Sequence, residues 1–186
     1  MRWERLFADL AAEIEATESA ELESEIADRT RSERARLRLV DRLRGSVGRP
    51  LTVRVAGVGA VAGALRAVGA DWFLVRPDGG ADRLVRTEAL LEVAGLAPSS
   101  AAEETGSMVA ARYSLAAVLR GLARDRTVVT MTLVDGSART GVIEVVGADL
   151  VEISDRRYDE PGLAVAPGTS ERRTVPLVAV AMIREH

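Results

Sequence analysis

The side chains that could carry chemistry are few, and they lack the usual catalytic partners. The 186-residue chain contains no Cys, its single His is the terminal His186, and all 25 of its basic residues are Arg. The usual nucleophile–base pairs, Schiff bases and zinc sites therefore cannot be built. A mechanism that uses carboxylates alone stays open in principle. We expect a protein that is not an enzyme and that holds no metal or cofactor.

The side chains that could bind a partner are aromatic rings and guanidinium groups. Aromatic rings can stack on bases, and guanidinium groups can pair with phosphates. The candidates for contact with RNA or with a protein partner are Trp72, Phe73, Arg36, Arg42, Arg156, Arg157, Arg172 and Arg173. We favour a core position for Phe73 over a base-stacking platform, and Trp72 would then point outward toward a helix or a partner. For the two arginine pairs we favour solvated loop charge over a phosphate clamp.

Composition indicates a globular protein with aliphatic cores. Hydrophobic residues make up 47% of the chain, charged residues 28% and aromatic residues 3%, and the formal net charge is −3. Such a balance suits small cores better than large cavities, and the negative charge disfavours nucleic acid unless a local basic patch decides. No signal-peptide pattern is present, and no apolar run approaches the ~18 residues of a membrane span. We expect a cytoplasmic location, with neither a membrane nor a small-molecule substrate.

An internal repeat is the most informative pattern in the chain. The sequence Val-Gly-Ala-Asp occurs at 68–71 and again at 146–149, and the same shift of 78 residues aligns Leu37 with Leu115 upstream. The recurring motif positions are Gly63, Gly69, Asp71, Gly141, Gly147 and Asp149. The two Asp residues each follow Gly-Ala at the expected start of a strand. We expect each to bond nearby backbone N–H groups and fix a turn.

The patterning around this repeat predicts the domains. We expect a charged helical segment over 1–45, a first barrel over 46–97, a linker over 98–110, and a helix with a second barrel over 111–186 that includes a long loop at 154–173. Alternation at 129–133 predicts a strand, and Asp135-Gly136 predicts a hairpin with a type I′ turn. Gly141 predicts a bend or a close backbone approach, and Pro176 predicts an edge or a 3₁₀ turn. Five short strands should curl into a closed or nearly closed barrel.

Charge is divided sharply within the expected N-terminal helix. Up to Asp28 there are nine acids and two arginines, whereas 29–54 holds nine arginines and two acids. We favour a solvated helix whose halves pair with each other or with a second copy. The alternative is that the arginine-rich half contacts phosphates, although the adjacent acids would repel a polyanion.

A helix followed by five bent strands resembles the Sm/LSm family, including its Hfq-type members. The residues that carry the resemblance are Asp135-Gly136, Gly141, Val142-Ile143 and Asp149, repeated in the first unit by Gly63, Leu65 and Asp71. Val75 and Ile153 stand where the family usually has Asn, and its final Arg-Gly is replaced by other residues. The resemblance therefore implies the fold more strongly than the family's RNA binding.

The sequence thus predicts a mainly β protein with some α-helix, built as two tandem, helix-led, five-stranded Sm-like (SH3-like) barrels behind an amphipathic N-terminal helix. The expected function is a non-catalytic binding or assembly module that self-associates as a dimer or small ring, or docks on a protein partner. RNA binding is one alternative. A PRC-barrel-like adaptor is another, because Val-Pro-Leu at 175–177 resembles the ending of that short barrel.

Overall fold

The computed structural model describes residues 37–97, 110–155 and 172–186, together with single positions between 25 and 35. The chain divides into two compact units, 1–38 and 39–186. Most of the helix expected over 1–45 lies outside the described residues, although those placed between 25 and 35 have helical backbone. Helix α2 covers only Leu39–Arg44. The linker expected over 98–110 lies outside the described residues as far as 109. The loop expected over 154–173 is shorter than predicted, because 154–155 belong to a strand that ends at 155 and 172–173 to one that begins at 172, and 156–171 lie outside the described residues.

The second unit is mainly β and consists of two halves with the same element order. We call residues 39–97 the first half and residues 110–186 the second half. After α2, the first half holds β1 (Pro50–Val55), β2 (Gly59–Val68), β3 (Trp72–Arg76), β4 (Arg83–Arg86), η1 (Thr87–Ala89) and β5 (Leu90–Ala94). The second half holds α4 (Leu115–Arg124), β6 (Val128–Leu133), β7 (Ala138–Val146), β8 (Leu150–Asp155), β9 (Arg172–Pro176), η2 (Leu177–Ala179) and β10 (Val180–Glu185).

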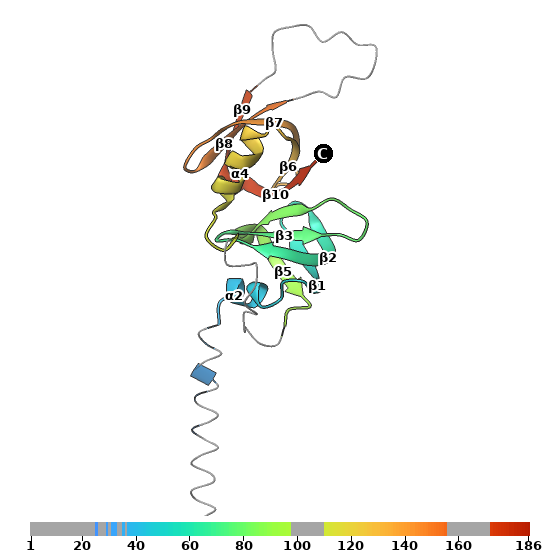
Figure 1. Ribbon diagram of the computed structural model, residues 1–186, viewed down its shortest axis with the longest axis vertical. Helices are drawn as coiled ribbons and strands as arrows, with labels where there is room; N and C mark the ends of the chain where they lie inside the picture. Colours follow the sequence, from blue (N-terminus) through green and yellow to red (C-terminus); the bar gives the residue numbers. More distant parts are fainter. Residues whose placement is uncertain are drawn as a thin grey trace, which may run out of the picture. The chain divides into compact units, whose positions relative to one another are not determined.

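All ten strands join in one antiparallel sheet, in the order β5-β1-β2-β3-β4-β10-β6-β7-β8-β9. Figure 1 shows β10 lying between the strands of the first half and those of the second. We expected each half to close its own barrel, but among the described strands β4 pairs with β10 and not with β5. A strand at the edge of a sheet leaves a row of N–H and C=O groups without hydrogen-bond partners. On β4, these groups bond to β10.

The repeat predicted from the sequence is also present in the strand pairing. A β-bulge lies between Leu65 and Ala67 in β2, and another lies 78 residues later, between Ile143 and Val145 in β7. Beyond the long loop the shift becomes 90 residues, because Val85 faces Phe73 in the first half and Val175 faces Val151 in the second. Each residue of one half therefore has a defined counterpart in the other.

The expected close approach at Gly141 is confirmed. A Cβ on Gly141 would collide with the carbonyl oxygen of Ser154, and one on Gly63 would collide with that of Arg76. Both glycines lie where the second strand of a half bends against the third. Any side chain there would force the two backbones apart.

The hairpin at Asp135-Gly136 is confirmed, but its expected type I′ turn is wrong. Only Gly136 has a positive φ, of 87°. The Gly136 N–H donates to Leu133 O, and the Leu133 N–H donates to Ser137 O, which makes a three-residue loop with glycine in the left-handed position. Asp135 accepts a hydrogen bond from the Ser137 N–H through Oδ1, at 2.9 Å. This local bond favours an ordinary right-handed conformation at Asp135.

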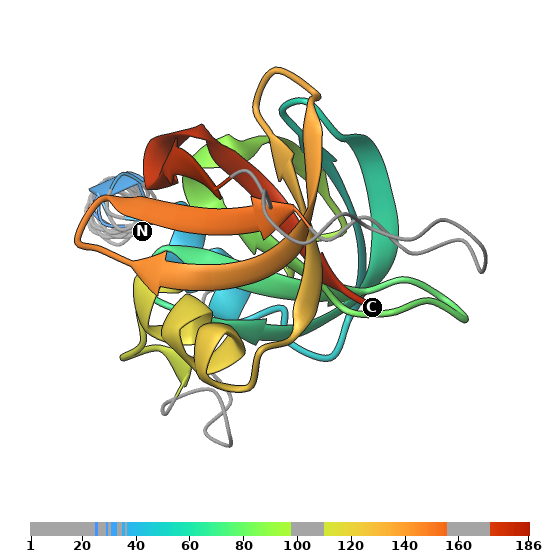
Figure 2. The same cartoon turned by 90° about the horizontal axis from the view of Figure 1, so that it is seen from above.

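Helix α4 begins and ends for identifiable reasons. Ser114 caps it, because its Oγ accepts from the Ala117 N–H at 3.3 Å. Leu115 and Leu119 lie one turn apart and are both buried. The chain leaves the helix through Arg126, whose φ of 50° is left-handed. Figure 2 shows α4, in yellow, beside the strands of the second half.

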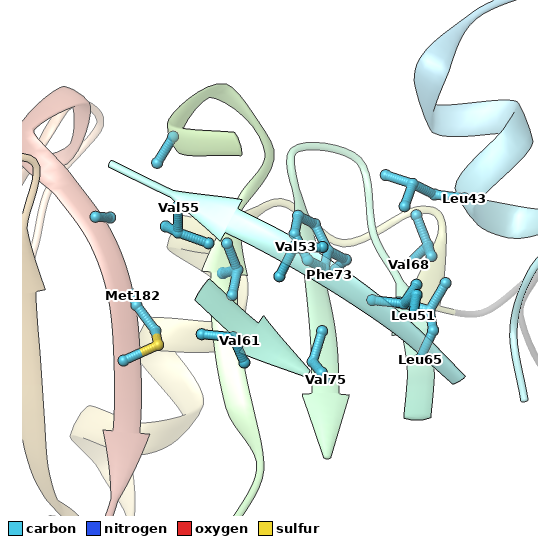
Figure 3. Packing of buried hydrophobic residues seen from close by; sticks show 13 residues of the cluster. Leu43, Leu51, Val53, Val55, Val61, Leu65, Val68, Phe73, Val75 and Met182 are labelled. Atoms are coloured by element: carbon cyan, nitrogen blue, oxygen red, sulfur yellow. The ribbon is translucent and has the colours of Figure 1, made fainter. Parts of the chain in front are cut away.

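Two hydrophobic clusters form the core, and each half contributes to both. The first cluster gathers the inward residues of the first half together with Ala181 and Met182 from β10. Figure 3 shows Met182 reaching this cluster beside Val61. The second cluster gathers α4 and the second-half strands together with Trp72 and Leu84. Because each half buries side chains of the other, the two halves form one folding unit.

Candidate functional site

The junction between the halves is built on the pairing of β4 with β10. Val85, Leu84 and Arg83 lie opposite Met182, Ile183 and Arg184, respectively. The turn between β1 and β2 also packs on the turn between β6 and β7. Gly57 has a φ of 69°, and a Cβ there would lie 2.6 Å from Gly136 N and would collide with Leu133 O. Glycine is therefore required at this turn, because it alone fits both the conformation and the space.

Polar contacts tie the repeated motif of the first half to the start of α4. Asp71 Oδ1 accepts from the Leu115 N–H at 2.6 Å, and the carbonyl of Tyr113 accepts from Trp72 Nε1 at 2.9 Å and from the Ala70 N–H at 3.1 Å. We expected Asp71 to bond a nearby backbone N–H and fix a turn. This is wrong, because the N–H that it bonds belongs to a residue 44 positions away. The carboxylate suits this place because the first N–H groups of a helix lack partners within the helix.

The two aromatic candidates are both buried. Phe73 is fully buried in the first cluster, so the interpretation as core is confirmed. Trp72 points away from that cluster and is buried in the second one. It meets the segment that leads into α4, as the sequence predicted for a helix contact, but it offers little accessible surface. Neither ring is presented for base stacking.

The candidate arginines are not brought together in the part of the chain that the structure describes. Arg42 donates to the carbonyl of Ala97 at 2.8 Å, in the first half. Arg172 pairs with Glu152 at 3.3 Å, in the terminal strands of the second half. Arg173 lies beside it on β9 and is half-buried. The other three candidates, Arg36, Arg156 and Arg157, lie outside the described residues.

Two further polar contacts of the described residues lie at the surface. His186 Nε2 lies 2.6 Å from Thr130 Oγ1, but this pair is exposed at the surface. Arg76 and Asp82 form two hydrogen bonds of 2.6 Å each across the loop between β3 and β4. These bonds to the guanidinium lower the pKa of the Asp82 carboxyl. Over the described residues, no group of three or more metal-ligating side chains occurs.

A small apolar cavity of about 160 Å³ lies at the junction of the halves. Its lining combines β3 and β4 of the first half with α4 and β10 of the second, through Trp72, Leu74, Asp82, Leu84, Val118, Leu122, Ile183 and Glu185. Two carboxylates and an indole N–H that is already bonded are its polar groups. This volume is below the usual range for ligand pockets.

Three exposed residues have counterparts that are buried or bonded at the junction of the halves. Leu91 on β5 is 65% exposed, whereas its counterpart Ala181 on β10 is 0% exposed. Leu37, just before α2, is 42% exposed, whereas Leu115 is 2% exposed. Asp149 is exposed, whereas its counterpart Asp71 holds the start of α4. Leu37 and Leu91 were not among our candidates, because the repeat pairs them with Leu115 and Ala181 without showing that only one member of each pair is buried.

Pro176, as predicted, lies at an edge and beside a 3₁₀ turn. It ends β9, the last strand of the sheet, and precedes η2. Its counterpart is Arg86, which lies just beyond the pairing of β4 with β10. A proline at the corresponding position of β9 therefore removes none of the hydrogen bonds by which β4 pairs with β10.

Comparisons with protein-family models, curated proteins and solved structures gave no match. Within the described residues, no helix is both long and apolar enough to cross a membrane.

Proposed function

We propose that each half is a small Sm-like barrel unit and that the chain is a non-catalytic assembly module. In this proposal, copies associate head to tail, with β9 of one copy pairing with β5 of the next. The strand order supports it, because β5-β1-β2-β3-β4 in the first half recurs as β10-β6-β7-β8-β9 in the second. Unpaired strand edges are the usual sites of such strand addition.

The observation that carries the proposal is the junction of β4 with β10. The two strands left at the ends of the sheet, β9 and β5, are the counterparts of β4 and β10. The surface that this chain uses to join its own halves is therefore presented again at its two ends. Contacts of this head-to-tail kind produce a closed ring when the rotation closes, and a small ring is the assembly we propose.

The internal register gives the register between copies. When the register of β4 with β10 is transferred by the repeat, β5 of one copy pairs with β9 of its neighbour. Glu92, Val93 and Ala94 of the first copy then lie opposite Val175, Thr174 and Arg173 of the second, respectively. Leu91 would then be covered as Ala181 is within the chain. The exposed carboxylate of Asp149 would face the backbone N–H of Leu37, as Asp71 faces that of Leu115.

Disulfide trapping tests this register in a chain that has no Cys of its own. Ala94→Cys and Arg173→Cys are made in separate full-length chains, which are mixed and oxidised. Directly opposite residues in antiparallel strands have Cα atoms about 4.5–5.5 Å apart, within the range for disulfides. We expect a crosslinked dimer in the mixture and little in either variant alone. Its size is read by non-reducing electrophoresis, and wild-type association by sedimentation velocity.

The control replaces Ala94→Cys by Ala62→Cys, which places the thiol on an exposed position of β2, away from the edge. If this control crosslinks as well as the matched pair, or if wild-type chain sediments as a monomer at high concentration, the proposal fails. RNA binding is less favoured, because Phe73 is buried and the candidate arginines Arg42 and Arg172 lie in different halves with partners of their own. A salt titration against single-stranded RNA checks it, because phosphate contacts weaken steeply with salt.

A further inference from the structure

The cavity at the junction of the halves shows which side chains meet there. Leu74 on β3 and Leu84 on β4 line it from the first half, and Leu122 on α4 lines it from the second. All three are apolar. This part of the internal junction is therefore held by hydrophobic contact, which changes little with salt.

The counterparts of these leucines are polar and charged. The repeat aligns Leu74 with Glu152 on β8, Leu84 with Thr174 on β9, and Leu122 with Arg44 at the end of α2. Glu152 and Thr174 lie at the β9 end of the sheet, and Arg44 belongs to the half that carries the β5 edge. At a junction between two copies, a carboxylate would replace one leucine and a guanidinium would replace the leucine facing it.

Both charged side chains have capacity for a further partner. Arg44 is half-buried, and it makes one hydrogen bond of 3.3 Å through each terminal nitrogen, from NH1 to Asp41 and from NH2 to the carbonyl of Gly69. Glu152 is half-buried, and its Oε2 lies 3.3 Å from Arg172 NH1. A carboxylate can accept several hydrogen bonds at once, and a guanidinium can donate five.

We propose that the junction between copies is a charged version of the junction between halves, in which Glu152 of one copy pairs with Arg44 of the next. The partner is thus a second copy of this chain, recognised by charge as well as by strand pairing. This inference rests on the proposed head-to-tail assembly. It adds that the assembly is salt-sensitive, whereas the internal junction is not, because screening weakens charge pairs at a partly solvated contact.

Charge reversal tests the pair in full-length chains. Glu152→Arg places two arginines face to face at the junction, and Arg44→Glu places two carboxylates there. We expect either variant to lower the association constant by at least about tenfold, because like charges at an interface oppose binding. The double variant Glu152→Arg with Arg44→Glu restores opposite charges at every junction whatever the number of copies, and its association should return to within about threefold of wild type. Sedimentation velocity at low salt measures each constant.

Two controls keep the result interpretable. Arg120→Glu makes the same change of charge at an exposed position of α4, away from both free edges, and should leave association unchanged. Glu152→Gln removes the charge without adding a new one, and should weaken association less than Glu152→Arg does. Recovery in the double variant would also show that a chain with Arg44→Glu still folds, although Arg44 bonds within its own half.

The outcomes separate this inference from the one on which it rests. Absence of wild-type association, together with absence of the crosslink between Ala94→Cys and Arg173→Cys chains, overturns the assembly itself. Wild-type association with the expected crosslink, but without any effect of the two charge reversals, overturns the Glu152–Arg44 pair alone. The same holds if the reversals weaken association but the double variant does not recover it.

Discussion

The junction between the halves and the two free edges of the sheet use equivalent strands but carry different side chains. At the junction, Ala181 and Met182 are buried among residues of the first half. Their counterparts on β5 are Leu91 and Glu92, both exposed. The turn contact differs too, because Asp135 stands where the internal junction needs Gly57. A side chain at that place would collide with the facing backbone, so the tight turn contact cannot repeat between copies.

The junction between the halves must form for the chain to fold, whereas a contact between copies at the free edges could depend on salt and protein concentration. The internal junction closes two hydrophobic clusters, and it cannot open without exposing both of them. The β5 edge exposes Leu91 beside the charged side chain of Glu92, a combination that is typical of contacts that form and dissociate. In the proposed assembly, the repeat would provide one permanent copy of the contact, between the halves, and one reversible copy, between chains.

The largest expected effect on stability comes from placing a charge at Ala181, and the same change at its counterpart Leu91 serves as the comparison. Ala181→Asp buries a carboxylate in the first cluster, and we expect the free energy of unfolding to fall by about 3–5 kcal/mol. Leu91→Asp makes the corresponding change on the free edge, where the side chain is solvated. It should change the free energy of unfolding by less than about 0.5 kcal/mol while abolishing association. Urea denaturation and sedimentation velocity measure the two quantities.

Ala62→Asp serves as the control, because it adds a carboxylate at an exposed position of β2. It should alter neither stability nor association. Equal destabilisation by Ala181→Asp and Leu91→Asp would mean that the two positions do not differ as the structure indicates. Retained association of the Leu91→Asp chain would mean that β5 is not the docking edge.

A smaller effect is expected at the turn that packs against the second half. Gly57→Ala combines left-handed strain with a collision against backbone, and should lower the free energy of unfolding by about 2–4 kcal/mol. Gly59→Ala has similar strain, since its φ is 88°, but its Cβ would meet nothing within 4 Å. It should cost about 1–2 kcal/mol. Thermal and urea denaturation measure the loss of stability in the two variants, and the difference between them is the contribution of the turn contact. Equal losses would mean that the turn contact contributes nothing.

The strands were predictable from the sequence because their signals are local or repeated. Alternation at 129–133, the hairpin at Asp135-Gly136 and the close approach at Gly141 all depend on neighbours within a few residues. The repeat then transferred the close approach at Gly141 to Gly63 in the other half, although the Asp-Gly dipeptide itself is not repeated. The turn type was missed because the choice depends on whether the Asp135 side chain bonds the Ser137 N–H, a competition that the dipeptide alone does not decide.

The junction of the halves was not predictable in this way. Val85 and Met182 lie opposite each other but far apart in sequence, and nothing in either strand states which edge it will join. The partner of Asp71 was missed for the same reason, since a carboxylate can bond a nearby N–H as readily as a distant one. Phe73 was predicted correctly, because a buried strand position depends on the local alternation.

The smallest of the three effects is expected at the repeated Asp. Asp71→Ala removes the bond to the Leu115 N–H and should lower the free energy of unfolding by about 1–2 kcal/mol, as loss of a cap does. Asp149→Ala should leave it unchanged, because in one chain that side chain is exposed and its proposed partner lies on another copy. Asp71→Asn, which keeps an acceptor, should recover part of the loss. Urea denaturation at low protein concentration measures all three in the single chain, and a loss at Asp149 equal to that at Asp71 would show that both residues act within their own copy.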